Sequence, residues 1–369
     1  MRLRYLALMT AILALVGGYT AYWFHTAGAA EQLFGRWSAQ LAEAGHQFDA
    51  KPEISGYPFR LVARLEQPSL TLRAEGLTTV WRPGNLRIIA QPWNLNHIIV
   101  LFDAPETLEI RDANRGAGLT RAVTLRAKPA RASLVFAHDG RLQRLAVDFE
   151  NVAIETPSLS DGAPEVPLRI ARARLRLISA DDQTVRERAN EVDAARGDDA
   201  PDFAPLTWVT AWKFEAIALG AAPTPGLAAG IALLEGEAGL HGVPPAPDPA
   251  RLAAWGAKRG GIEITHFRLD WGDLHVTATG PLTLDSNGYP AAALDTRIID
   301  YPRLIDGANG AGLIEDGAAL AARMLIALMP RNASDGSVPV PVIAKGGLLF
   351  FGPVPVANLP AIGAPRPTG

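Results

Sequence analysis

Residues 261–280 read GIEITHFRLDWGDLHVTATG, the most regular stretch of the chain. Apolar and polar side chains alternate along it on both sides of the tripeptide Trp271-Gly272-Asp273. Alternation with a period of two is typical of a strand that turns one face to a core, and a Gly-containing interruption between two such runs indicates a tight turn. This stretch therefore predicts an antiparallel hairpin.

Similar alternating runs fill most of the chain after Gly45, with turn residues between neighbours at intervals of roughly ten residues. The other predicted strands are residues 59–65, 69–74, 86–90, 97–101, 107–111, 123–127, 132–137, 142–149, 152–156, 169–177, 207–219, 282–285, 291–299, 338–344 and 347–351. The predicted fold class is mainly β (α+β): an extended curved antiparallel sheet with an N-terminal membrane-anchor helix and a few short packing helices.

Two of the short helices are predicted in the second half. Asp248 has the residue type of an N-cap, so we predict a helix over 248–259, with Trp255 packing on the sheet. A second helix is predicted over 311–329, where apolar residues recur three and four apart, and we expect that apolar stripe to face the sheet. The repeating residues include Leu320, Ala321, Met324, Leu325 and Leu328.

The N-terminus carries a segment long enough to cross a membrane. Residues 5–24 contain no charge, and roughly 20 helical residues span about 30 Å, the hydrocarbon thickness of a bilayer. Arg2 and Arg4 precede this segment and aromatic residues crowd its far end at 19–24. Basic residues favour the cytoplasmic side and aromatic residues the lipid–water boundary, so we expect residues 31–369 to be exported.

A cleaved signal peptide is the alternative, with residues 6–16 as its apolar core and Ala27-Gly28-Ala29 as a small-residue cleavage site. Both interpretations export the body of the protein. The uncleaved anchor is favoured because the helical apolar spacing continues to Leu41, and Gly45 is a natural helix end.

Composition excludes several classes of protein. The 369 residues are 48% hydrophobic and 20% charged, which excludes disorder of the whole chain. The net charge is −3, so a concentrated basic surface for nucleic acid is not expected. With no cysteine, the chain has no disulfide, no cysteine-ligated zinc, no iron–sulfur cluster and no thiol nucleophile.

The predicted organisation follows the change from helical to strand periodicity, and an acidic stretch with few apolar residues interrupts the strands. The segments are an N-terminal transmembrane anchor or signal peptide at 1–30, an N-terminal β region at 31–180, an acidic loop at 181–206, a C-terminal β region at 207–360 and a disordered tail at 361–369.

No motif in the sequence indicates catalysis. The seven histidines form no zinc-binding pair on one helix, and the Gly-x-Ser-x-Gly nucleophile motif is absent. We interpret the basic face of residues 169–177 as a solvated strand face; an anionic ligand is the alternative. Four side chains near the 271–273 turn are interpreted as polar partners rather than as a metal site: His266, Asp270, Asp273 and His275. No catalytic, cofactor-binding or metal-binding residue is predicted, and no cofactor.

Several local patterns together resemble an uncharacterised bacterial family, domain-of-unknown-function family 2125. They are Gly18-Tyr19-x-x-Tyr22-Trp23, Ile54-x-Gly56-Tyr57-Pro58-Phe59-Arg60-Leu61, Gln91-Pro92-Trp93-Asn94, Trp271-Gly272-x-Leu274, Gly280-x-Leu282-x-Leu284-Asp285-x-x-Gly288-Tyr289-Pro290 and Gly347–Phe351 with Gly352-Pro353-Val354-Pro355. The resemblance covers residues 5–360 and implies exported proteins held by one N-terminal segment, mainly in alphaproteobacteria. It implies no activity, and no functional residue is carried over.

A looser, fold-level similarity to AsmA-like and other anchored β-rich envelope proteins implies that lipid is carried in an extended groove. We therefore expect a non-enzymatic inner-membrane protein with one span at residues 5–24, its body in the periplasm, and lipid or another apolar ligand in a β-sheet groove. A scaffolding role with an envelope protein partner is the alternative, and a cell-envelope hydrolase comes third; no nucleic acid is expected. The residues predicted to line the groove are Ile98, Val100, Phe136, Ile264 and Phe267.

Overall fold

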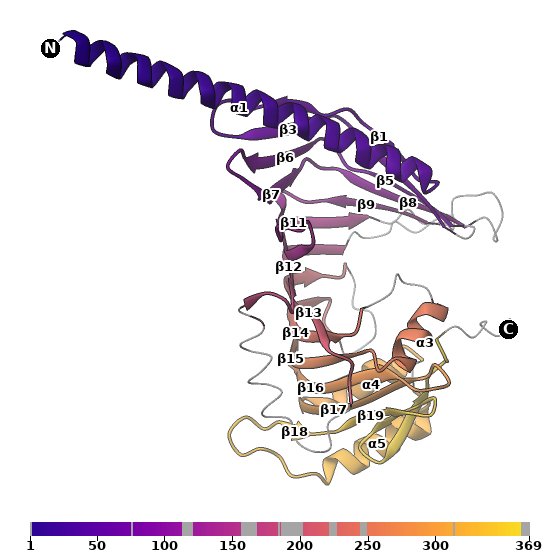
Figure 1. Ribbon diagram of the computed structural model, residues 1–369. Helices are drawn as coiled ribbons and strands as arrows, with labels where there is room; N and C mark the ends of the chain where they lie inside the picture. Colours follow the sequence, from indigo (N-terminus) through magenta and orange to yellow (C-terminus); the bar gives the residue numbers. More distant parts are fainter. Residues whose placement is uncertain are drawn as a thin grey trace. The chain divides into compact units, whose positions relative to one another are not determined.

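The computed structural model describes residues 2–74, 77–112, 121–155, 168–183, 185, 202–220, 227–243, 249–312 and 314–362 (Figure 1). Its paired strands are antiparallel in the part of the chain that the structure describes, with a long N-terminal helix and a few short helices, and the sheet is not closed. The predicted mainly β fold class is thereby confirmed. The chain divides into an N-terminal unit, Met1–Leu142 with Asp148–Glu165, and a C-terminal unit, Gln143–Val147 with Val166–Gly369.

The N-terminal unit consists of one helix and a sheet with two arms. Its elements are α1 (Arg2–Glu43), β1 (Gln47–Asp49), β2 (Glu53–Ser55), β3 (Leu61–Leu65), β4 (Ser69–Ala74), β5 (Leu77–Arg82), β6 (Leu86–Gln91), β7 (Asn94–Phe102), β8 (Glu106–Asp112), β9 (Arg121–Arg126), β10 (Ala130–Phe136) and part of β11 (Leu142–Glu155). One arm pairs in the order β2–β3–β6–β7–β10. The other arm pairs in the order β1–β4–β5–β8–β9–β11.

Helix α1 ends where the sequence predicts. Gly45 has φ 81°, the left-handed conformation that glycine adopts most easily. The amide of Gly45 donates to the carbonyl of Ala42 and that of His46 donates to Leu41, as in a Schellman C-cap. The first half of the helix is apolar and exposed around its circumference, and it is long and apolar enough to cross a membrane.

The C-terminal unit contains a meander of long strands followed by helices and a short hairpin. Its elements are β12 (Leu168–Ser179), β13 (Leu206–Ala218), β14 (Gly230–His241), α3 (Pro249–Ala257), β15 (Gly261–Trp271), β16 (Leu274–Leu284), β17 (Pro290–Ile299), α4 (Tyr301–Gly310), α5 (Asp316–Ala327), β18 (Val338–Pro339), β19 (Val342–Lys345), β20 (Leu348–Phe351) and β21 (Val354–Asn358). Residues 261–280 form the predicted hairpin, in which Trp271 pairs with Leu274 and Gly272 has φ 62°.

The C-terminal unit has a closed core where α4 and α5 meet β16, β17 and the last strands. Leu274 from β16, Ile305 from α4 and Ile326 from α5 are each at most 2% exposed. The other buried members of this cluster are Ile298, Tyr301, Ile314, Ala319, Ala322, Val338, Val340 and Val356. We call these residues the C-terminal core.

Two predictions about this region are wrong. The helix predicted over 311–329 is α5 alone, and a separate helix, α4, precedes it. The predicted packing stripe is also on the wrong face, because Leu320, Met324 and Leu328 are 54%, 58% and 84% exposed, whereas Ala319, Ala322 and Ile326 are buried. The small side chains of Ala319 and Ala322 let the backbone of α5 approach the sheet closely. At that short distance the larger side chains of Leu320, Met324 and Leu328 do not fit between helix and sheet, so they face outward.

Five strands of the structure were not predicted from the sequence: β1, β2, β5, β14 and β21. Residues 230–241 form β14 although they were not predicted as a strand, since Gly230, Gly236 and Gly239 interrupt the alternation. A Cβ at Gly236 would lie 2.3 Å from the ring of Trp212, so the glycine makes room for that indole. Residues 354–358, for which no strand was predicted, form β21 and pair with β20. Asp248, most of the 181–206 loop and residues 363–369 lie outside the described residues.

Candidate functional site

Three of the five predicted groove residues share one face of the N-terminal unit. β7 pairs with β10 so that Ile98 lies opposite Leu134 and Val100 opposite Ala132. Phe136 follows Leu134 by two residues and therefore projects from the same face of β10. The face continues onto β6, where Ala90 and Ile88 lie opposite Ile98 and Val100. We call the apolar side of β3, β6, β7 and β10 the inner face.

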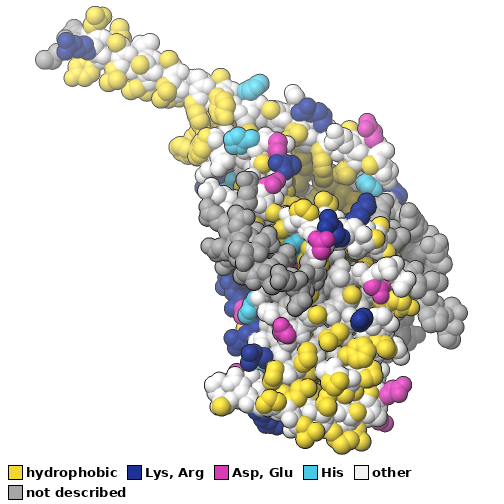
Figure 2. All heavy atoms as spheres, turned by 60° about the horizontal axis from the view of Figure 1, so that its bottom comes forward, with side chains coloured by type: hydrophobic (Ala, Val, Ile, Leu, Met, Phe, Trp, Pro, Cys, Tyr) yellow, Lys and Arg dark blue, Asp and Glu magenta, His cyan; other side chains and the backbone are white. Residues whose placement is uncertain are grey.

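Aromatic contacts join the inner face to the other arm of the same unit. The ring of Trp81 in β5 meets that of Phe102 in β7 edge-on, with 6.5 Å between ring centroids. Phe102 in turn meets Phe149 in β11 at 6.0 Å. The apolar faces of the two arms are therefore turned toward each other, and Figure 2 shows hydrophobic side chains at the bottom of a hollow below α1.

Helix α1 bridges the edge strands of the two arms. Trp23 and Ala27 are buried with Leu61 of β3, and Ile54 of β2 packs against them. Farther along the helix, Phe34 and Trp37 contact Phe48 of β1 at 5.4 and 5.0 Å between ring centroids. The helix thus covers the inner face at the β2–β3 edge.

Burial changes across the inner face. Leu61, Leu65 and Leu86, at the β3 edge, are 5% exposed or less. Ile98, Val100 and Phe136, in β7 and β10, are only partly buried although they belong to neighbouring paired strands. On the same face, Ala130 and Ala132 of β10 are buried, at 5% and 7% exposed. The larger side chains beside them are therefore the part of this face that is incompletely covered.

One carboxyl group belongs to this apolar environment. Glu106 in β8 lies opposite Leu125 of β9 and shares a strand face with Leu108 and Ile110. Partial burial raises the pKa of Glu106, and a hydrogen bond from the Trp81 side chain opposes that rise. The site therefore combines an apolar surface with a single hydrogen-bonding acid that sequence reasoning did not select.

The other two predicted residues, Ile264 and Phe267, lie in the C-terminal unit and form a separate apolar face. They are three residues apart, a spacing that would put them on opposite faces of a regular strand. A β-bulge between them restores the alignment, because Ile264 pairs with Gly280 and Phe267 with Ala278 of β16. Both side chains are partly buried. The five predicted residues are thus divided between the two units, three in the N-terminal and two in the C-terminal unit.

The opposite face of the C-terminal unit is charged and internally paired. Arg174, from the basic run in β12, contacts Glu215 at 3.1 Å, and Lys213 contacts Glu235 at the same distance. Neighbouring acids on β13 and β14 therefore offset basic residues of this face, in agreement with a solvated strand face.

Of the four polar residues near the 271–273 turn, Asp270 and His275 bond to each other, whereas Asp273 and His266 bond to residues outside the set. Asp270 accepts hydrogen bonds from Arg268 and His275. Asp273 pairs with Arg303 at 2.7 Å, and His266 lies 3.7 Å from Glu235. Over the part of the chain that the structure describes, no group of three or more such side chains has the geometry of a metal site.

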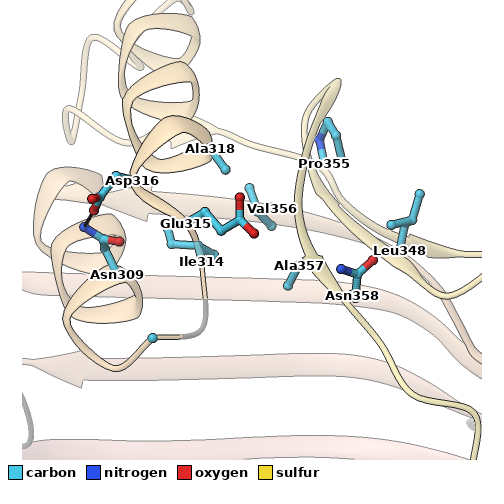
Figure 3. Close-up of a pocket in the computed structure, with 11 residues that line it drawn as sticks. Asn309, Ile314, Glu315, Asp316, Ala318, Leu348, Pro355, Val356, Ala357 and Asn358 are labelled. Atoms are coloured by element: carbon cyan, nitrogen blue, oxygen red, sulfur yellow. Dashed lines mark hydrogen bonds between the residues drawn. The ribbon is translucent and has the colours of Figure 1, made fainter.

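A cavity lies beside α4 and α5 in the C-terminal unit (Figure 3). It has a volume of about 770 Å³ and is lined by both helices and the β20–β21 hairpin. Asn309 donates to Asp316 across its mouth at 2.9 Å, and Glu315 and Asn358 also line it. Sequence reasoning missed this cavity because it expected no strand at 354–358. Its mixed lining contains neither a paired acid and base nor a continuous apolar wall, so it is a weaker candidate than the inner face.

Comparison with known proteins places the whole body of the chain in one family. No curated protein and no solved structure matches it. The profile of a family described as "Uncharacterized protein conserved in bacteria (DUF2125)" matches residues 23–360, which include the inner face, both units and the C-terminal core. The chain therefore belongs to this family of uncharacterized bacterial proteins, DUF2125.

Proposed function

We propose that this protein is a non-enzymatic, membrane-anchored envelope protein that holds the acyl chain of a lipid against the inner face. The observation that carries the proposal is the partial burial of Ile98 and Val100 in the paired part of β7 and of Phe136 at the end of β10. An acyl chain would cover these side chains at about 25 cal/mol per Å² of apolar surface removed from water.

The N-terminal helix supports the anchor. The segment at 5–24 is apolar and exposed over its first half, and its roughly 20 residues suit one membrane span with the basic Arg4 directly before it. On this proposal residues 5–24 lie in the inner membrane and the body lies in the periplasm. A lipid ligand is then available from the membrane in which the protein is anchored.

The acid in the site supports a ligand with a polar end. The carboxyl of Glu106 lies with Trp81 at the apolar face, and its raised pKa favours the protonated, hydrogen-bond-donating form relative to an exposed glutamate. When protonated, this carboxyl can donate to an ester carbonyl or phosphate oxygen of a lipid, and when ionised it can accept from a headgroup hydroxyl or ammonium. We propose a binding role for Glu106, not a catalytic one.

The test is to extract the full chain from membranes under native conditions and identify co-purifying lipid by mass spectrometry. Val100→Asp should abolish co-purification, because an unpaired charge on the inner face opposes an acyl chain. Ile99→Asp is the matched control: Ile99 is the next residue in β7, projects from the opposite face and is 37% exposed. It should retain the lipid.

A bulky substitution separates loss of ligand from loss of fold. Val100→Phe should occupy the space left for the acyl chain, so lipid should be lost while the circular dichroism spectrum stays unchanged. In a filled core the same enlargement would strain the structure by about 1–3 kcal/mol. Wild-type protein that carries no stoichiometric lipid under native extraction would overturn the proposed ligand.

A scaffolding function has one specific observation in its favour. Leu320, Met324 and Leu328 repeat every four residues along α5 and its C-terminal end, and all three are more than half exposed. Figure 2 shows hydrophobic side chains gathered over the lower part of the molecule, where Figure 1 places α5. An apolar stripe of this kind suits a groove on another protein. Loss of a co-purifying protein in Met324→Asp, with lipid retained, would support that second function.

A further inference from the structure

Two loops of the N-terminal unit are fastened to the last turns of the apolar part of α1. The first is the loop at 57–60, between β2 and β3. The hydroxyl of Tyr19 donates to the carbonyl of Pro58, and Nε1 of Trp23 donates to the carbonyl of Arg60 at 3.0 Å. The indole of Trp23 also meets the ring of Tyr57 edge-on, with centroids 5.5 Å apart. These contacts therefore fix the position of the loop relative to this part of α1.

The second loop is the turn at 92–95, which joins β6 to β7. The hydroxyl of Tyr22 donates to the carbonyl of Pro92 at 2.7 Å. Pro92 is buried below the helix, whereas Trp93 and Leu95 project outward and are 59% and 47% exposed. Loop and helix thus present their apolar side chains on a common exterior surface.

The exposed side chains around this junction are large and mostly aromatic. Phe59 in the first loop is 68% exposed and Phe24 on the helix is 62% exposed, while the rings of Phe24 and Tyr57 stack at 6.1 Å. We call this set the aromatic collar: Tyr22, Phe24, Tyr57, Phe59, Trp93 and Leu95. A contiguous exposed apolar surface of this kind marks a binding face on most soluble domains.

The depth of the collar follows from the length of the helix. A span of roughly 20 residues that begins at Tyr5, after Arg4, ends near Phe24. Tyr19 and Trp23, which hold the first loop, therefore precede the end of the span by one to five residues. At 1.5 Å per residue, the loop meets the helix up to about 8 Å inside that end.

The charges of both loops agree with this depth. Residues 57–60 carry one charged side chain, the basic Arg60, and residues 92–95 carry none. Aromatic residues with nearby basic groups are favoured at the lipid–water boundary, whereas acids are not attracted to anionic headgroups.

We infer that the aromatic collar is inserted into the outer interface of the bilayer that α1 crosses, so that its partner is the lipid surface. The inference rests on the proposed function in one respect, that residues 5–24 span the membrane. The N-terminal unit then contacts the bilayer through three segments, α1 and the loops at 57–60 and 92–95, and not through α1 alone. Tryptophan and tyrosine are energetically favoured at this location, because their apolar rings contact the acyl chains while their polar groups stay hydrogen-bonded.

Because the chain has no cysteine, single-cysteine variants of the full protein can report the depth of each position. The variants are Phe59→Cys and Trp93→Cys in the collar and Leu13→Cys in the span. Asp103→Cys is the matched control, since Asp103 follows the far end of β7 and lies about 33 Å along that strand from Trp93. Each variant carries a polarity-sensitive fluorophore in phosphatidylcholine–phosphatidylglycerol vesicles, with spin-labelled lipid and aqueous iodide as quenchers.

Labels at Phe59 and Trp93 should show blue-shifted emission, quenching by shallow spin-labelled lipid and at least threefold weaker iodide quenching than the label at Asp103. If iodide quenches the labels at Phe59 and Trp93 as strongly as the label at Asp103, while the label at Leu13 is still quenched by spin-labelled lipid, the collar is not inserted. The membrane span of α1 would then still hold. A label at Leu13 that is open to iodide would overturn the span itself, and with it the proposed anchor. Protection from both quenchers at Phe59 and Trp93 would indicate burial against a second copy of the chain and would also overturn the inference.

Discussion

The C-terminal core and the inner face are built from strands with the same alternating pattern, yet one is closed and the other is only partly covered. In the C-terminal unit, α4 and α5 lie over the sheet with small residues such as Ala319 and Ala322 at the contact, and their neighbours are fully buried. In the N-terminal unit, α1 covers the β2–β3 edge and leaves Ile98, Val100 and Phe136 partly exposed. The elements that cover a strand face, not the strand itself, determine whether it becomes a closed core or stays partly exposed.

The largest effect that separates the two regions should come from truncating a residue of the C-terminal core. Ile326→Ala should destabilise the C-terminal unit by about 2–5 kcal/mol, because Ile326 is 2% exposed and its removal leaves a cavity. Met324→Ala, two residues away in the same helix and 58% exposed in the native chain, should change stability by less than about 0.5 kcal/mol. Hydrogen exchange of the α5 and β17 amides measures both. Equal protection in the two variants would show that α5 is not docked through its alanine face.

A second test enlarges a side chain in each region. Ala322→Leu should cost about 1–3 kcal/mol, because Ala322 is 0% exposed and the added atoms must displace the sheet or the helix. Val100→Phe in ligand-free protein should cost little or even stabilise, since the added ring covers apolar surface on the inner face. Thermal unfolding of delipidated protein compares the two. A penalty for Val100→Phe as large as that for Ala322→Leu would show that the inner face is a filled core.

Much of the fold could be predicted from the sequence, because strand and turn signals are local. The hairpin at 261–280 and the helix end at Gly45 depend on residues within a few positions of one another. The packing face of α5 could not be predicted in the same way. Two stripes repeat at helical spacing, and the choice between Leu320 and Ala322 depends on how closely a distant sheet approaches.

The candidate site was predictable only as a set of apolar strand positions. Ile98, Val100 and Phe136 were selected from alternation, and their pairing across β7 and β10 agrees with that selection. The presence of Glu106 at the same apolar surface depends on the β8–β9 register and on Trp81, which no local signal reveals. Likewise, Tyr19 and Pro58 are recognisable as separate motif residues, but their hydrogen bond joins positions 39 residues apart.

A smaller effect should follow from weakening the attachment of the 92–95 turn to α1. Tyr22→Phe removes the hydroxyl that donates to Pro92 and keeps the ring, so it should cost about 0.5–1.5 kcal/mol. Protease sensitivity near Trp93 in detergent-solubilised protein measures local opening of the turn. Tyr5→Phe, near the opposite end of the apolar helix, is the control and should leave the cleavage rate unchanged. Equal rates in both variants and the native protein would show that the bond does not hold the turn.

The smallest effect concerns pH and should be confined to the N-terminal unit. Because burial raises the pKa of Glu106 in the folded protein above its usual value of 4.5, the folded state binds the proton more tightly than the unfolded state does. Its contribution to stability is therefore fully present below pH 4.5 and is lost as pH rises through the raised pKa. Glu106→Gln stays neutral throughout and retains an acceptor for the Trp81 side chain.

The variant should therefore match the native protein at pH 4, and its β8 amides should exchange more slowly than the native ones at pH 7.5. Glu66→Gln, at an exposed turn of the same unit, should show no such difference. A Glu106→Gln variant that is less protected than the native protein at pH 7.5 would mean that the ionised carboxylate is stabilised in place. Bound acyl chain should enlarge the difference, since it removes more water from Glu106, whereas the amides of the C-terminal core should not respond to the variant at either pH.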